Sequence, residues 1–185
     1  MTIDVVYIAY FNEEIGYDIK AVERFLNSYH IHSAGKEHSL IIIAKNVPDE
    51  NTYAELRKLA GLVNARIIDL PDDGLDFGAY FRVSEMLTSE YVLYIGSGIE
   101  IAEKDWLLKF YNAFEHDESF QLVGPMGSWA DTREQVFPNY HIRTCAFMMK
   151  RELFLEYAST QDFPVTKQDT YEMEHGKNSL TIQNP

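Results

Sequence analysis

The sequence is poor in cysteine, in basic residues and in long apolar runs. Cys145 is the single cysteine among 185 residues, so the chain cannot form an internal disulfide, and a reducing compartment is expected. The 16 Lys and Arg residues are outnumbered by 29 Asp and Glu, which gives a formal net charge of −13 without any basic run. Nucleic acid is therefore not an expected partner, because binding to a polyanion depends on clustered cations. No apolar segment comes near the roughly 18 residues that span a bilayer, so we expect a soluble, cytoplasmic protein.

The motifs of several common enzyme classes are also missing. The first predicted strand leads into AYFNEE and not into a G-x-G-x-x-G turn, which disfavours a dinucleotide site. The chain has no G-x-x-x-x-G-K-[ST] phosphate loop and no G-x-S-x-G nucleophile elbow. His and Cys do not cluster at the spacings of a zinc site.

What the sequence does contain is an alternation of strand-like and helix-like segments. The predicted strands are nearly continuous in apolar residues, as in parallel sheets covered on both faces: residues 3–10, 39–45, 65–70, 91–95, 121–126 and 144–150. Between them, apolar residues recur three and four positions apart, as in helices: residues 15–29, 48–59, 77–87, 106–114 and 151–157. From about residue 161 onward we expect loop with one short helix. This order predicts a single α/β domain, residues 1–185, with a mostly parallel sheet flanked by helices.

Ligands of open α/β sheets bind beyond the carboxyl ends of the strands, so the residues that follow each predicted strand are the candidates for a site. They are residues 10–13, Lys45 and Asn46, residues 71–76, 96–100 and 127–129, and the segment around Arg151.

Two blocks resemble a known family. Residues 71–114, PDDGLDFGAYFRVSEMLTSEYVLYIGSGIEIAEKDWLLKFYNAF, resemble the central segment of GT-A-type, family-two-like glycosyltransferases. Residues 137–154, FPNYHIRTCAFMMKRELF, are similar to a later strand of that fold. More narrowly, both blocks resemble a bacterial group related to rhamnan synthesis.

The resemblance implies a single GT-A-like domain that moves a sugar from a nucleoside-diphosphate sugar to a glycan or lipid-linked acceptor in polysaccharide biosynthesis. It is compatible with peripheral association with a membrane and with a homo-oligomer. Little chain follows residues 167–176, where the resemblance places the catalytic base. We therefore expect the acceptor side to be completed by a C-terminal extension or by a partner subunit.

The chain departs from the family pattern in YVLYIGSGIEI, residues 91–101. Gly96 and Gly98 take the places of the two aspartates of the metal-binding D-x-D motif, and neither has a side chain that binds a cation. In that fold the metal stabilises the leaving diphosphate. Something else must supply this charge, or the transfer fails.

Three replacements are open. Glu100 could hold Mn²⁺ or Mg²⁺ with one of the three aspartates at residues 72–76, cations could neutralise the diphosphate directly, or no transfer takes place. The nearby cations are His141, Arg143, Lys150 and Arg151, with Arg82 as a further candidate. Ser97 could also donate a hydrogen bond to a phosphate that approaches the glycines.

Four further residues have both a ligand-binding and a structural interpretation. The resemblance assigns Asp73 and Asp76 to the ribose or base of the nucleotide, while turn chemistry and an N-cap at Asp76 are the alternative. Asn12 either lines the nucleotide pocket or caps the first helix. Trp129 either stacks on a sugar or lies in the core.

The base that takes the proton of the acceptor hydroxyl is a carboxylate. The resemblance places it in KQDTYEMEHG, residues 167–176, where Glu174 is the first choice, followed by Asp169 and Glu172. The alternative is a solvated acidic turn.

We therefore expect a glycosyltransferase that is metal-independent or has an atypical metal site. The alternative is a catalytically inactive relative that binds a nucleotide or a saccharide. A nucleotidyltransferase is a third hypothesis, which the lack of a glycine-rich basic loop after the first strand disfavours.

Overall fold

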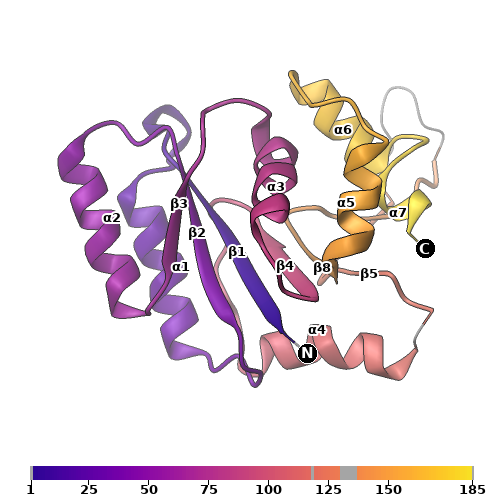
Figure 1. Ribbon diagram of the computed structural model, residues 1–185, viewed down its shortest axis with the longest axis horizontal. Helices are drawn as coiled ribbons and strands as arrows, with labels where there is room; N and C mark the ends of the chain where they lie inside the picture. Colours follow the sequence, from indigo (N-terminus) through magenta and orange to yellow (C-terminus); the bar gives the residue numbers. More distant parts are fainter. Residues whose placement is uncertain (1, 118, 130–136, 185) are drawn as a thin grey trace.

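A six-stranded sheet with the order β3-β2-β1-β4-β8-β5 forms the centre of the molecule (Figure 1). The structure is a computed structural model that describes residues 2–117, 119–129 and 137–184. The strands are β1 (Ile3–Tyr10), β2 (Ser39–Lys45), β3 (Arg66–Asp69), β4 (Tyr91–Ile95), β5 (Leu122–Val123) and β8 (Ala146–Lys150). β1 to β4 are parallel, whereas β8 runs antiparallel to both β4 and β5. The prediction of an α/β domain with a mostly parallel sheet is confirmed.

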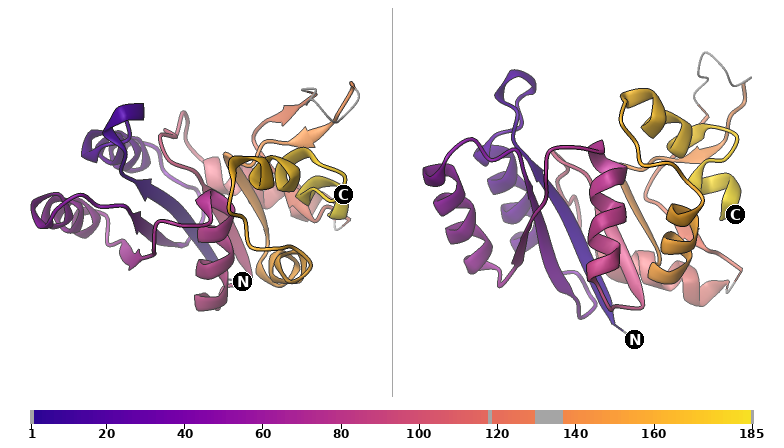
Figure 2. Two further views of the ribbon diagram at one scale, coloured as in Figure 1. Left: turned by 90° about the horizontal axis from the view of Figure 1, so that it is seen from above. Right: turned by 45° about the horizontal axis from the view of Figure 1, so that its top comes forward.

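Helices cover both faces of the sheet (Figures 1 and 2). One core cluster joins the sheet to α1 (Ile19–Ile31), α2 (Glu50–Leu62) and α4 (Trp106–His116). The other joins it to α3 (Leu75–Met86), α5 (Arg151–Ser159), α6 (Lys167–His175) and α7 (Leu180–Gln183). The inner strands β1, β2 and β4 are buried on both sides, which explains their unbroken apolar sequences.

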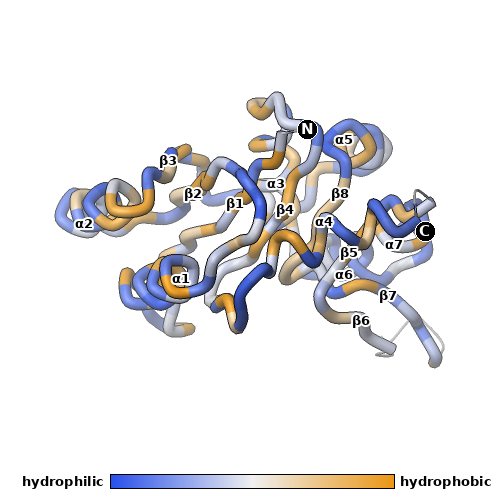
Figure 3. The backbone as a smooth tube through the Cα atoms, turned by 90° about the horizontal axis from the view of Figure 1, so that it is seen from below, coloured by the Kyte–Doolittle hydropathy of each residue, from blue (hydrophilic) through white to orange (hydrophobic). Residues whose placement is uncertain are grey.

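A two-stranded ribbon and a short helix complete the described elements. β6 (Gly127–Ser128) pairs antiparallel with β7 (His141–Ile142), and the 3-10 helix η1 (Glu13–Ile15) follows β1. Along the tube in Figure 3, α1 alternates between hydrophilic and hydrophobic residues, as expected for a helix with one buried side.

Local capping explains where the helices differ from the predicted segments. α1 begins at Ile19 because the Asp18 carboxylate accepts the amide of Ala21 at 3.1 Å. Gly74, with φ of 66°, takes the cap position of α3, and Asp76 instead lies in the first turn. After residue 161 the chain forms two helices, α6 and α7, where one was expected, and α6 begins with a capping box.

The aromatic centre of the second core cluster gives a prediction for stability. Phe154 is fully buried, with its ring centroid 4.6 Å from Tyr94 and 5.8 Å from Phe147. Phe154→Ala should lower the free energy of unfolding by about 3–5 kcal/mol, because it removes a large ring and leaves a cavity. Urea unfolding measures this loss. Phe120→Ala is the control, since Phe120 is 44% exposed, and a similar loss in both variants would contradict the assignment of the core.

Candidate functional site

The carboxyl ends of the four parallel strands meet at one edge of the sheet, where β8 begins. The antiparallel register pairs Ile95, the last residue of β4, with Ala146, the first residue of β8. Residues that precede β8, such as Arg143 and Thr144, therefore lie at the same edge as the residues that follow β1 to β4. We call this edge the carboxyl edge.

Arg151 does not lie at the carboxyl edge. Lys150, at the end of β8, pairs with Tyr91, at the start of β4, so Lys150 and Arg151 lie at the opposite end of the sheet. The Arg151 guanidinium donates to the carbonyls of Ser89 and Ser84 at 3.3 and 3.2 Å. The prediction that Arg151 binds the donor is wrong, because a strand that returns antiparallel carries its following residues away from the edge.

The turn of Gly96, Ser97 and Gly98 uses its own donors within the protein. The Gly96 amide donates to the carbonyl of Cys145 at 2.8 Å, and the Ser97 hydroxyl donates to that of Ile8 at 2.9 Å. Burial raises the pKa of Tyr7 to about 12, and the Gly98 amide partly opposes this by hydrogen bonding to the Tyr7 hydroxyl. The single proton of Ser97 is thus already engaged, contrary to its predicted role as a phosphate donor.

A side chain at Gly98 would be crowded in this turn. The residue has φ of 73°, a conformation that glycine adopts most readily. A Cβ there would lie 2.8 Å from Cε1 of Tyr17. An aspartate at this position would therefore require the Tyr17 ring to move.

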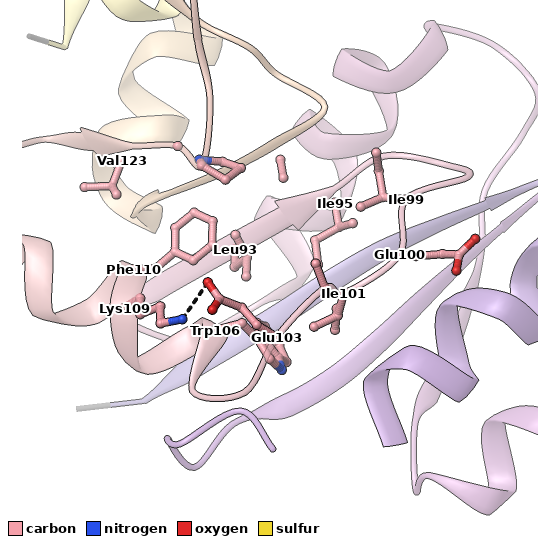
Figure 4. A pocket seen from close by; sticks show the side chains of 14 residues that line it. Leu93, Ile95, Ile99, Glu100, Ile101, Glu103, Trp106, Lys109, Phe110 and Val123 are labelled. Atoms are coloured by element: carbon pink, nitrogen blue, oxygen red, sulfur yellow. Dashed lines mark ion pairs between the residues drawn. The ribbon is translucent and has the colours of Figure 1, made fainter. Parts of the chain in front are cut away.

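Glu100, Asp72 and Asp73 each have a cationic partner. Glu100 pairs with Arg24 at 3.3 Å and points away from the neighbouring apolar side chains (Figure 4). The other pairs are Asp72 with Lys45 at 4.0 Å, and Asp73 with Arg82 through two contacts. Within the described residues, no three His, Cys, Asp or Glu side chains are placed to hold a metal ion. The residues present thus do not fit the metal site proposed around Glu100.

Lys45 is a buried cation at the carboxyl edge. Its side chain is 3% exposed, and its ammonium donates to the carbonyls of Asp73 and Leu75, both at 2.9 Å. Leu75 has a positive φ of 51°, so Lys45 stabilises a strained turn at the start of α3. Burial lowers the pKa of Lys45 while the neighbouring aspartates raise it. Lys45 was expected among the residues that form the site at the strand ends, but its hold on the turn before α3 was not expected, although a lysine at the end of the otherwise apolar SLIIIAK is a usable signal.

Asp76 lies where this turn meets the C-terminal part of the chain. The residue is exposed by surface area, but protein atoms surround its carboxyl group closely enough for partial desolvation to raise its pKa. The cations of Lys167 and Lys45 lower the pKa, and Glu174 raises it. The structure thus brings Asp76 within electrostatic reach of the first-choice base.

Glu174 is held at the carboxyl edge by one of its two oxygens. Oε2 accepts hydrogen bonds from the amide of Thr144 at 3.0 Å and from the Thr144 hydroxyl at 2.5 Å. Oε1 faces Arg143 Nε at 3.5 Å and His141 Nε2 at 3.9 Å. The side chain is 14% exposed, so Thr144 fixes one oxygen, while the other faces the guanidinium of Arg143 and the ring of His141.

The two other carboxylates considered as the base have different roles. Asp169 closes the capping box of α6, accepting from the amides of Val165 and Thr166 at 2.8 and 2.7 Å. Its pKa is lowered by these bonds. Glu172 accepts a bond from Gln168 one turn earlier. Of the three, Glu174 has contacts with the start of β8.

His141 is anchored through one ring nitrogen and turns the other toward Glu174. Its Nδ1 lies 2.9 Å from the carbonyl of Asn139, which only accepts, so Nδ1 carries a hydrogen. Nε2 is buried without a hydrogen-bond partner and is the nitrogen that faces Glu174. His141 is therefore part of the Glu174 cluster, not an independent exposed cation.

Asn12 caps a short helix and also borders a hollow. Its side chain accepts the amide of Glu14 at 3.1 Å and caps η1. It also lines a hollow of about 510 Å³ at the ends of β1 and β2, together with Phe11, Asn46 and Thr52. Trp129, by contrast, is 56% exposed, which rules out the core alternative.

An apolar pocket of about 400 Å³ lies beside the carboxyl end of β4, on the side of the sheet that α4 covers (Figure 4). Leu93 and Ile95 line it from β4, and Phe110 lines it from α4. Its cation, Lys109, is paired with Glu103 at 2.6 Å. The pocket offers little to a diphosphate.

The raised pKa of Asp76 predicts how the stability of the protein depends on pH. Because its pKa lies above the ordinary 3.8, the folded state binds more protons than the unfolded state between these two values, and stability falls as pH rises through that range. Asp76→Asn should therefore raise the Tm at pH 7 relative to the parent protein, and the gain should shrink as the pH approaches 4. Asp162→Asn, at another exposed aspartate that lies outside the candidate site, is the control for calorimetry. A lower Tm for Asp76→Asn at pH 7 would contradict the burial argument.

Comparison with known proteins rests on structure. No protein-family model and no curated protein matches the chain. Staphylococcus aureus TarS 1–349 superposes with a TM-score of 0.57 at 16% identity, covering 91% of this chain and 53% of that one. Glucosyl-3-phosphoglycerate synthase of Mycobacterium tuberculosis gives 0.51 at 20% identity, covering 82% and 58%. The chain thus spans about half the length of these two neighbours.

A third neighbour matches over nearly its whole length. The 4-diphosphocytidyl-2C-methyl-D-erythritol synthase of Anaerococcus prevotii has a TM-score of 0.58 at 14% identity, covering 99% of this chain and 93% of that one. Likenesses at 14–20% identity establish architecture. The chain has the GT-A-like fold of nucleotide-diphospho-sugar transferases.

Proposed function

We propose that the protein transfers a sugar from a nucleoside-diphosphate sugar to an acceptor hydroxyl, with the carboxyl edge as the active site and without a metal ion at Gly96 and Gly98. The observation that carries this proposal is the geometry of Glu174, with Oε2 held by Thr144 and Oε1 facing the edge. A base needs such a fixed carboxylate with one accessible oxygen.

The fold neighbours support the choice of donor. S. aureus TarS 1–349 has been solved with UDP and with UDP-GlcNAc, and the mycobacterial synthase with Mn²⁺, UDP and phosphoglyceric acid. We place the nucleotide over the ends of β1 and β2, where Asn12 and Asn46 line a hollow, and the diphosphate nearer the start of β8.

In the proposed reaction, Glu174 Oε1 takes the proton of the acceptor hydroxyl while the hydroxyl oxygen bonds to the anomeric carbon. The bond from that carbon to the diphosphate breaks, and the nucleoside diphosphate leaves with the electron pair. Arg143, 44% exposed, and Lys167 are the cations placed to offset the diphosphate charge. Lys45 acts differently, because two of its donors already hold the turn before α3.

The internal hydrogen bonds of the Gly-Ser-Gly turn favour a second candidate, a protein that binds the nucleotide sugar without turnover. A nucleotidyltransferase remains a third candidate because of the extensive match to the A. prevotii synthase. It predicts release of pyrophosphate from a nucleoside triphosphate, which a coupled assay detects.

Nucleotide binding is tested by a thermal-shift screen of uridine, guanosine, cytidine and thymidine diphosphates, with and without Mn²⁺ and with EDTA. We expect one nucleotide to raise the Tm and the rise to survive the chelator, because the bound charge is offset by Arg143 and Lys167. A rise that requires Mn²⁺ would contradict metal independence. No rise with any nucleotide would contradict both the enzyme and the binding protein.

Catalysis is tested by Glu174→Gln, with Glu172→Gln on the same helix as the matched control. We expect Glu174→Gln to lower kcat by about 100- to 10,000-fold, the usual contribution of a general base, while the nucleotide-dependent rise in Tm is kept. Release of nucleoside diphosphate from the sugar donor provides the readout. Equal activity in the two variants would remove Glu174 as the base, and binding without release in the parent protein would favour the non-catalytic candidate.

A further inference from the structure

Two large aromatic side chains lie exposed on the β6–β7 ribbon. Trp129 and Tyr140 are 56% and 55% exposed, and their ring centroids are 4.3 Å apart. The pairing of Ser128 with His141 places them at the next cross-strand position. The ribbon projects from the body on the side of the sheet where α1 lies (Figures 2 and 3). Two rings of this size in contact but open to solvent form a ready surface for stacking.

The same ribbon contributes to the candidate active site. His141 is 4% exposed and faces Glu174, and the Arg143 amide donates to the carbonyl of Met126 at 3.0 Å. Because side chains alternate along a strand, Tyr140 lies on the opposite side of the ribbon from His141. Consecutive Cα atoms are about 3.8 Å apart, so Tyr140 lies directly beside His141, the residue that faces the proposed base.

We propose that Trp129 and Tyr140 bind a sugar ring of the acceptor, which is a neutral glycan, at a subsite next to the ring that reacts. The inference rests on the proposed function, because the base takes its proton from the acceptor and the ribbon joins the aromatic pair to the base. It assigns the sugar on which Trp129 was expected to stack to the acceptor and not to the donor.

The chemistry of the surroundings favours a neutral sugar. The C–H faces of a pyranose stack on aromatic rings, while its hydroxyls need polar partners at the rim, and the half-exposed Arg143 guanidinium lies two residues beyond His141. The net charge of −13 disfavours an anionic polymer or an anionic lipid surface. The nucleotide is expected at the other side of the carboxyl edge, over β1 and β2.

Intrinsic fluorescence tests this subsite directly. The chain has two tryptophans, and Trp106 is 7% exposed, so a change on titration with neutral oligosaccharides of glucose, N-acetylglucosamine, rhamnose or mannose reports on Trp129. We expect at least one series to change the emission and to bind more tightly as a second and third sugar unit is added. No response to any series overturns the proposal, as does a response to anionic vesicles alone.

Variants separate stacking from folding. Trp129→Ala and Tyr140→Ala should each weaken oligosaccharide affinity about tenfold or more by calorimetry, while Tyr171→Ala, at an exposed ring on α6 that is 43% exposed, should not. The nucleotide-dependent rise in Tm should be unchanged in all three. Unchanged oligosaccharide affinity in both ribbon variants overturns the platform and leaves the proposed transferase standing, whereas loss of the nucleotide response in the parent protein is a failure of the proposed function.

Discussion

The antiparallel pairing of β8 with β4 is the constraint on which the site depends. It brings the residues before β8 to the end of β4, and it sends the residues after β8 to the other end of the sheet. Thr144 is thereby placed to hold Glu174, and α6 is placed close enough for Glu174 to influence Asp76. The site is thus made of an N-terminal half, which follows the parallel strands, and a C-terminal half, which the returning strand supplies.

Cationic side chains hold the carboxylates and the backbone carbonyls near the carboxyl edge. Lys45 is buried against the turn before α3, Arg82 holds Asp73, and Arg24 holds Glu100. The turn at Gly96 to Gly98 closes on itself through Cys145, Ile8 and Tyr7. The three residues of this turn offer no carboxylate to a cation. The desolvated carboxyl of Asp76 and the strained Leu75 lower stability locally, as is common where a ligand later supplies the missing interactions.

Much of the fold follows from the sequence because burial on both faces produces continuous apolar strands, as in β1, β2 and β4. The short ribbon of β6 and β7 was missed, since two-residue strands carry no period. The direction of β8 was also not visible, because an apolar strand reads the same in either orientation. That one unknown explains why the segment around Arg151 was expected among the strand ends that form the site, although it lies at the opposite end of the sheet. Contacts such as those of Thr144 and Lys45 join segments that are far apart in the chain. A single sequence does not show which distant segments meet.

The central claim is that the carboxyl edge, including the start of β8, binds the nucleotide sugar. Amide chemical-shift mapping by NMR, with UDP-sugars and the other nucleoside-diphosphate sugars added in the presence of EDTA, tests it most directly. We expect shifts at Asn12, Asn46, Asp76 and Thr144, and none at Lys150 and Arg151. Shifts gathered at Lys150 and Arg151, or no shifts with any donor, would contradict the account.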